Sequence, residues 1–121
     1  MKEQLAAELG VESISDLQRQ PQLAVGFSNE FMDRGDGWPS LRRRYDLNFA
    51  SVTGLEHGLA YRAVDVGDID ITDVYSTDPN IRQYELRVLR DDLEHFPRYN
   101  AVYLYRRDLE TRQPSFVERL R

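Results

Sequence analysis

The sequence predicts a single α/β domain over residues 1–121, with a central mixed β-sheet flanked by helices. Its length of 121 residues suits one domain, since domains most often have roughly 100–150 residues. Short apolar segments with strand character alternate along the chain with segments of helical character, which is typical of α/β proteins. Hydrophobic residues make up 40% of the chain and charged residues 31%, a balance that excludes both a disordered chain and a membrane-embedded one.

Two helical segments and a strand are predicted at the start of the chain. Residues 2–9 are strong helix formers, and the glycine after them is a natural helix end. Ser15-Asp16-Leu17 predicts a short helical turn that ends before Pro21. We expect a buried strand in the apolar run over residues 23–27, followed by a short helix after Ser28.

Helices and strands continue to alternate in the middle of the chain. Trp38-Pro39 opens a helix that ends about Asp46, because proline is favoured near the first turn of a helix. Residues 48–52 alternate as a strand should, and an apolar stripe at helical spacing predicts a helix over 54–66. Residues 69–75 then alternate between apolar and polar side chains, which predicts the next strand.

The last third of the chain predicts two more strands and two more helices. A short helix is expected over residues 78–84, with strands at 86–89 and 101–105. A terminal helix is predicted over 107–121, interrupted near Pro114 because proline cannot continue a helix.

Charge and composition exclude several classes of function. The net charge is −5 and the pI is about 5.0, which argues against a general nucleic-acid-binding protein. The chain has no cysteine, so disulfides, cysteine-ligated metals and thiol catalysis are excluded. It has no apolar run of the about 20 residues that a spanning helix needs, and we expect any export signal to lie outside this chain.

No catalytic, metal or cofactor site is predicted from the motifs. An acidic run lacks the glycine of a calcium-binding loop, so we interpret its members as helix-end, turn and strand residues: Asp65, Asp68, Asp70 and Asp73. His57 and His95 have no second histidine at metal-binding spacing. Neither Ser28 nor Ser76 lies in a nucleophile elbow of the form G-x-S-x-G. We therefore predict that the protein is not an enzyme.

Two tyrosines stand where a ligand site could form. Tyr75 ends a predicted strand, and ligands of open α/β sheets bind beyond the carboxyl ends of strands. Tyr99 immediately precedes another predicted strand. Tyrosine faces together with an arginine suit a ligand that carries a quaternary ammonium and a carboxylate. From position alone an alternative stays open, in which both tyrosines are boundary residues with hydrated hydroxyl groups.

Four blocks of the sequence resemble, in the right order, the osmoprotectant-binding proteins of glycine betaine, choline and carnitine ABC importers. The first block, GFSNEFMDRGDGWPSL over residues 26–41, is similar to the family pattern G-x-x-x-E-F-x-x-R-x-D-G-x-x-x-L. The others are HGLAYRA over 57–63, DITDVYSTD over 70–78 and LRDDLEHFPRY over 89–99. The resemblance covers most of this chain but only about half of such a binding protein.

The resemblance implies a fold and a role. Proteins of this family have two α/β lobes of the type II periplasmic-binding-protein fold, and ligand is trapped between them. This chain resembles the second lobe, so the implied partners are a small quaternary amine, the first lobe of the same protein and an ABC permease. The implied location is the periplasmic or extracellular face of the membrane, without a membrane-spanning segment or a cofactor. An alternative is an interaction or sensory module that reuses the lobe without transport.

The resemblance also implies three site residues. Arg34 matches the arginine that engages ligand from this lobe, and Tyr75 and Tyr99 match two walls of the aromatic cage. The sequence departs from the family at Asp46, where relatives usually carry glycine. Aspartate tolerates the left-handed conformation better than most residues, so we expect the helix end to form there nonetheless.

Overall fold

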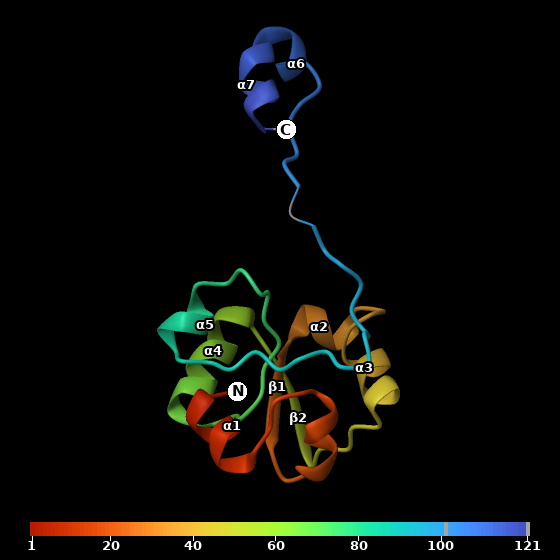
Figure 1. Cartoon of the computed structure of the whole chain (residues 1–121), viewed down its shortest axis with the longest axis vertical. Helices are drawn as coiled ribbons and strands as arrows, with labels where there is room; N and C mark the ends of the chain where they lie inside the picture. Colours follow the sequence, from red (N-terminus) through yellow and green to blue (C-terminus); the bar gives the residue numbers. More distant parts are fainter. Residues whose placement is uncertain (101, 121) are drawn as a thin grey trace.

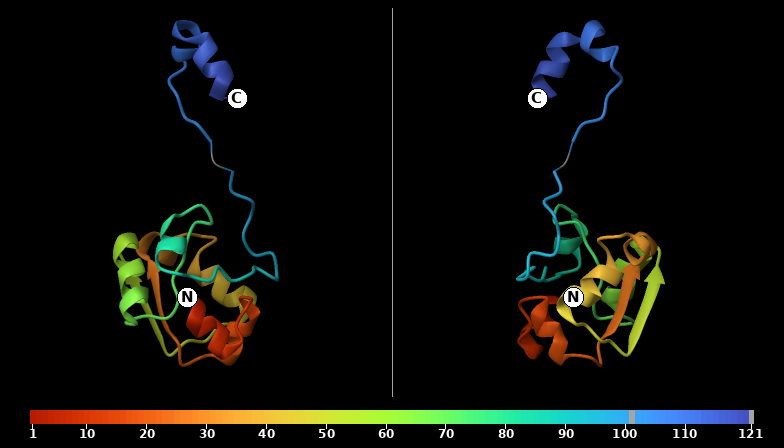
Figure 2. Two further views of the ribbon diagram at one scale, coloured as in Figure 1. Left: turned by 60° about the vertical axis from the view of Figure 1, so that its left-hand side comes forward. Right: turned by 90° about the vertical axis from the view of Figure 1, so that its right-hand side faces the viewer.

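A computed structural model describes residues 1–100 and 102–120. Its elements, in chain order, are α1 (Glu3–Leu9), η1 (Ser15–Arg19), β1 (Ala24–Ser28), α2 (Asn29–Asp33), α3 (Trp38–Tyr45), β2 (Ser51–Leu55), α4 (His57–Val66), α5 (Asn80–Gln83), α6 (Leu109–Arg112) and α7 (Pro114–Leu120). The elements from α1 to α5 form one body in which helices surround the strands, while α6 and α7 lie away from it (Figure 1). Two further views show the same separation (Figure 2). None of the helices in the described residues is long and apolar enough to cross a bilayer.

The centre of the body is a small parallel sheet. β1 and β2 pair in parallel, with Val25 opposite Val52. A third segment joins on the other side of β1, where Ile71 forms a parallel bridge with Val25. Its carbonyl accepts a 3.0 Å hydrogen bond from the amide of Gly26. β1 is therefore the central strand, and an α/β architecture is confirmed.

The helix ends follow the chemistry of the sequence. Gly10 and Gly67 end α1 and α4 in the left-handed conformation, with φ of 66° and 82°. Asp46 ends α3 with φ 49° and ψ 48°, so aspartate occupies the left-handed position as expected. The hydroxyl of Ser28 accepts a hydrogen bond from the amide of Phe31 and caps α2. These local signals fixed the helix ends at or within one residue of their predicted positions.

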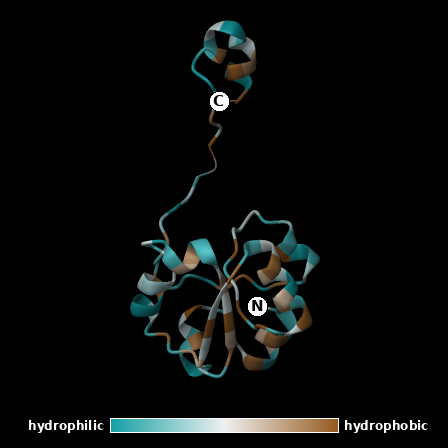
Figure 3. Ribbon diagram, turned by 180° about the vertical axis from the view of Figure 1, so that it is seen from behind, coloured by the Kyte–Doolittle hydropathy of each residue, from teal (hydrophilic) through white to brown (hydrophobic). Residues whose placement is uncertain are grey.

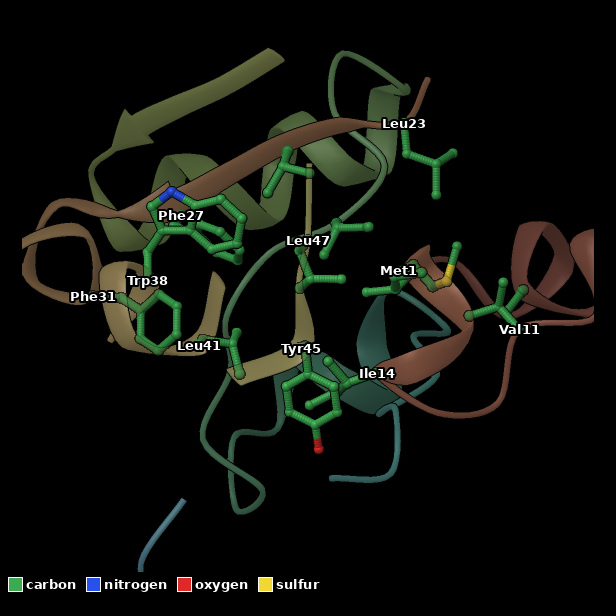
Figure 4. Close-up of a cluster of buried hydrophobic side chains, with 14 residues drawn as sticks. Met1, Val11, Ile14, Leu23, Phe27, Phe31, Trp38, Leu41, Tyr45 and Leu47 are labelled. Carbon is green, nitrogen blue, oxygen red and sulfur yellow. The ribbon is translucent and has the colours of Figure 1, made fainter. Parts of the chain in front are cut away.

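One hydrophobic cluster packs α1, η1, α2 and α3 against β1 (Figure 4). Tyr45 and Leu47, both members of this cluster, are almost completely buried. The ring of Trp38 lies 5.1 Å from that of Phe27, which secures the start of α3 against the sheet. Hydrophobic and hydrophilic residues alternate along the helices, and hydrophobic residues also occur along the strands (Figure 3). Burial of this apolar surface is the main force that holds the body together.

A second cluster packs α4 onto the other side of the sheet. Tyr61 and Val64 of α4 lie against Ile69 and Leu86. Gly26 lets these side chains pack closely on β1, since a β-carbon there would stand 2.6 Å from the side chain of Ile69 and 2.8 Å from that of Leu55. The apolar stripe predicted over residues 54–66 is therefore only partly right: Leu59 and Val66 are exposed, and α4 is buried instead through Ala60, Tyr61 and Val64.

Several predicted strands are shorter, shifted or not formed. Residues 48–52 were expected to pair, but β2 begins at Ser51 and continues through Leu55, so α4 starts only at His57. The predicted strand over 69–75 is reduced to a bridge at Ile71. The pairing stops there because the amide of Ser28 donates its hydrogen bond to the carboxylate of Asp73, at 2.6 Å, and not to a backbone carbonyl. Residues 86–89 also contribute only a bridge, between Leu86 and Lys2.

The predicted strand at 101–105 is wrong over residues 102–105, which have no regular structure. Residue 101 lies outside the described residues. Leu104 is 94% exposed, and a strand forms only where a neighbour satisfies its backbone groups. The terminal helix is broken as expected, since α6 ends at Arg112 and α7 begins at Pro114.

Candidate functional site

The carboxyl ends of three parallel segments meet at one edge of the sheet. β1 ends at Ser28, β2 ends at Leu55, and the segment through Ile71 continues toward Tyr75. Because the segments are parallel, the residues that follow them gather at the same edge, which is where open α/β sheets bind ligands. The residues after these ends therefore define the candidate site.

A buried polar contact joins two of these ends. The carboxylate of Asp73 accepts hydrogen bonds from the amide and the hydroxyl of Ser28, at 2.6 and 2.7 Å. Ser28 is buried, and its hydroxyl also caps α2. Asp73 thereby fixes the start of α2 relative to the segment that leads to Tyr75.

Arg34 follows α2 directly and lies in a tight loop. Its amide donates to the carbonyl of Glu30 at 3.0 Å, and its Nε donates to Asp36 at 2.5 Å. The pKa of Arg34 is raised first by the hydrogen bond to Asp36; burial opposes this, and the Tyr75 hydroxyl adds a smaller increase. Arg34 is therefore a permanent cation within reach of Tyr75. The loop closes at Gly37, where a β-carbon would lie 2.0 Å from the carbonyl oxygen of Phe31.

Tyr99 reaches the same arginine from a distant part of the chain. The guanidinium carbon of Arg34 lies 5.6 Å from the centre of the Tyr99 ring and 5.9 Å from that of Phe31. These distances are in the range of cation–π contacts. Tyr99 is 58% exposed, so much of its side chain is accessible to a ligand.

The loop over residues 91–96 brings Tyr99 to this place. The carboxylate of Asp91 accepts hydrogen bonds from the hydroxyl of Tyr45 at 2.5 Å and from the amides of His95 and Phe96 at 2.9 and 2.8 Å. Burial works against ionisation of Asp91, but these hydrogen bonds outweigh it and lower its pKa. Burial, followed by the hydrogen bond to Asp91, raises the pKa of Tyr45 well above its usual range.

Tyr75 lies beside a histidine that the sequence analysis did not select. The ring of His57 lies 6.1 Å from that of Tyr75, and its Nε2 is 3.5 Å from the carboxylate of Asp78. Asp78 also accepts a 2.7 Å hydrogen bond from the hydroxyl of Tyr61. His57 follows β2 at the carboxyl edge of the sheet. The sequence pattern did not reveal this position, because it predicted a helix from residue 54 and so placed residue 57 inside that helix. In the structure β2 continues through Leu55, and His57 is the first residue of α4.

Arg34 thus lies at the centre of the three predicted site residues, with Tyr75 and Tyr99 beside it. The arrangement is an open face rather than an enclosed pocket, since both tyrosines are more than half exposed. Two open hollows of about 600 and 580 Å³ lie elsewhere, and neither contains any of the three residues. The first is lined by residues from α2 to Asn48, and the second lies between α1 and α5.

Comparison with protein families and curated proteins gives a consistent result. The whole chain, residues 1–121, matches the model of the substrate-binding domain of ABC-type glycine betaine transport systems. A glycine-betaine-binding protein of Pseudomonas aeruginosa is 34% identical over 97% of this chain and 42% of its own length. The carnitine transport binding protein OpuCC of Listeria monocytogenes is 30% identical over 95% of this chain and 38% of its own length.

Solved structures show the same relationship in the fold. The crystal structure of a glycine betaine/carnitine/choline ABC transporter protein has a TM-score of 0.80 and 30% identity, over 99% of this chain and 44% of that one. The fold also matches apo YehZ from Escherichia coli, with a TM-score of 0.69, 20% identity and coverage of 79% of this chain and 38% of that one. The chain spans about two-fifths of the length of these relatives. It belongs to the family of substrate-binding domains of ABC-type glycine betaine transport systems, which is a family of transport proteins and not of enzymes.

Proposed function

We propose that this chain is the second lobe of a two-lobed binding protein, and that it contributes Arg34, Tyr75 and Tyr99 to a site for a small quaternary amine. The observation that carries this proposal is the placement of one arginine between two tyrosines, at the carboxyl edge of the sheet. Tyrosine faces attract a cation that cannot donate hydrogen bonds, and the guanidinium of Arg34 pairs with a carboxylate.

The names of the relatives support this ligand class. They include proteins for glycine betaine and carnitine, and an ergothioneine transport permease/binding protein of Helicobacter pylori that is 29% identical over 93% of this chain and 21% of its own length. All three ligands carry a trimethylammonium group and a carboxylate. The two tyrosines would complement the cationic end of such a ligand, and Arg34 would complement its anionic end.

The openness of the site supports a second lobe. A bound small molecule is normally about 70–90% buried, yet Tyr75 and Tyr99 are exposed on this chain. A first lobe that closes over this face would complete the site, and an ABC permease at the outer face of the membrane would receive the ligand. The chain spans less than half of its relatives, which leaves room for such a lobe.

Calorimetric titration of the intact two-lobed protein with glycine betaine, carnitine, choline and proline tests the proposal. We expect saturable binding of the quaternary amines and none of proline at the same concentration. Arg34→Ala should weaken the binding of glycine betaine more than the binding of choline, because choline has no carboxylate for Arg34 to bind. Binding of none of the quaternary amines, or equal binding of proline, would overturn the proposed ligand class.

A further inference from the structure

We propose that His95 is a positioning residue of this site, which holds Tyr99 against Arg34 by tying together the two chain segments that carry them. The inference about ligand affinity rests on the proposed function, whereas the inference about position concerns this chain alone. His95 Nε2 lies 3.0 Å from the carbonyl oxygen of Asp36 and 3.3 Å from the hydroxyl of Ser40. Asp36 belongs to the loop of Arg34, and Ser40 to α3.

The partners of the ring decide where its proton sits. A carbonyl oxygen can only accept a hydrogen bond, so the contact with Asp36 requires a proton on His95 Nε2. The hydroxyl of Ser40 donates to the carbonyl of Gly37 at 3.1 Å, which leaves a lone pair of its oxygen toward the imidazole. Both partners therefore fit an Nε2–H donor. The ring is oriented by hydrogen bonds and not by packing alone.

The backbone of His95 is held as firmly as its ring. Its amide and that of Phe96 donate to the two carboxylate oxygens of Asp91, while Asp91 is itself held by Tyr45. The ring of His95 meets Phe96 edge-on at 4.8 Å, and Phe96 lies 6.1 Å from Phe31 of α2. These contacts fix the end of the loop over residues 91–96 against α2 and α3.

Only a short, stiff span separates this anchor from Tyr99. It consists of Phe96, Pro97 and Arg98. Proline fixes its own φ and restricts the residue before it, so the position of His95 limits where Tyr99 can go. Among the described residues, no other hydrogen bond joins the loop of Arg34 to the segment of Tyr99. Loss of the Nε2–H donor should therefore release Tyr99 from Arg34.

Nuclear magnetic resonance on the 121-residue chain tests the inference without any ligand. In the wild-type chain we expect nuclear Overhauser effects between the Tyr99 ring and the side-chain methylenes of Arg34. His95→Leu, which removes the donor at similar volume, should abolish them. His95→Gln should retain them, because its amide places an N–H donor near the original Nε2.

Two outcomes of this experiment would overturn the inference. One is a folded His95→Leu chain that keeps the Tyr99–Arg34 effects, and the other is a His95→Gln chain that loses them as fully as His95→Leu. The wild-type chain provides a test that needs no variant: the ¹⁵N shift of His95 Nε2 must be that of a protonated ring nitrogen. A shift typical of an unprotonated Nε2 would refute the proposed contact even if His95→Leu failed to fold.

A double-mutant cycle in the two-lobed protein tests the effect of His95 on ligand affinity. His95→Leu should weaken the binding of glycine betaine by roughly tenfold, and should cause no further loss of affinity in a Tyr99→Ala background. An equal loss in both backgrounds would show that His95 does not act through Tyr99. If the wild-type protein bound no quaternary amine, the proposed function would fail while the magnetic-resonance result would still decide the positioning role.

Discussion

The guanidinium of Arg34 lies over the ring of Tyr99 at 5.6 Å, although the two residues come from different segments of the chain. Tyr99 and Tyr75 should each contribute to cation binding in the two-lobed protein. Tyr75→Ala or Tyr99→Ala should weaken the binding of glycine betaine by about 1–2 kcal/mol, which is a roughly tenfold loss of affinity. Titration calorimetry measures this, and Tyr103→Ala, which removes an exposed tyrosine outside the site, serves as the control.

The isolated chain should fold but bind quaternary amines hardly at all. Two exposed cation–π contacts give about 0.5–1 kcal/mol each, and a solvent-screened ion pair about 0–1 kcal/mol. Association costs at least about 4 kcal/mol, so the sum is near zero or unfavourable. Titration of this chain with glycine betaine should show no saturable heat below millimolar concentrations. A micromolar dissociation constant would contradict this and would point to a second copy completing the site.

Gly37→Ala should destabilise the loop of Arg34, whereas Gly35→Ala should not. A β-carbon at Gly37 would meet the carbonyl oxygen of Phe31, while nothing lies within 4 Å of one at Gly35. Overpacking of this kind typically costs about 1–3 kcal/mol, and substitution at an open site is close to neutral. Urea unfolding of both variants measures the difference. Equal stability of the two would show that the loop can move away from Phe31 without cost.

Tyr45→Phe should destabilise the body by about 1–3 kcal/mol, because it removes two part-buried hydrogen bonds of a buried tyrosine, one of them to a carboxylate. The hydroxyl donates to Asp91 and accepts the amide of Leu93 at 2.7 Å. Tyr103→Phe, at an exposed position, should change stability by no more than about 0.5 kcal/mol. Chemical denaturation compares the two variants, and similar effects would mean that packing alone holds the loop over residues 91–96.

Stability should fall in acid through Asp16. Hydrogen bonds from the backbone of Ser13 and of Glu12, followed by that from the Ser13 hydroxyl, lower the pKa of Asp16 from 3.8 to about 2. A lowered folded-state pKa stabilises the fold above pH 3.8, and this contribution is lost as the pH falls toward 2. Asp16→Asn should therefore be less stable at pH 6 and lose less stability between pH 4 and 2. Denaturation curves at both ends of this range measure the effect, and parallel losses in wild type and variant would contradict it.

Local signals in the sequence determined most of the helix ends, although α4 begins at His57 and not at residue 54 as predicted. Gly10, Ser28, Asp46 and Gly67 act within a few residues of themselves, through backbone conformation and side-chain caps, so their effects could be predicted without knowledge of the rest of the chain. The resemblance likewise predicted Arg34, Tyr75 and Tyr99 as site residues, and the structure brings both tyrosines to the arginine.

Strand bounds and the positions around the site were decided only by the tertiary structure. A strand persists only where a neighbour accepts its backbone hydrogen bonds. A period-two pattern does not reveal that the Asp73 carboxylate, and not a strand carbonyl, accepts the hydrogen bond from the amide of Ser28, or that residues 102–105 have no regular structure. The placement of His57 beside Tyr75 and of His95 beside Asp36 depends on contacts between distant segments. Such contacts arise from the packing of the whole body, which no local pattern specifies, and so the supporting residues of the site emerged only from the fold.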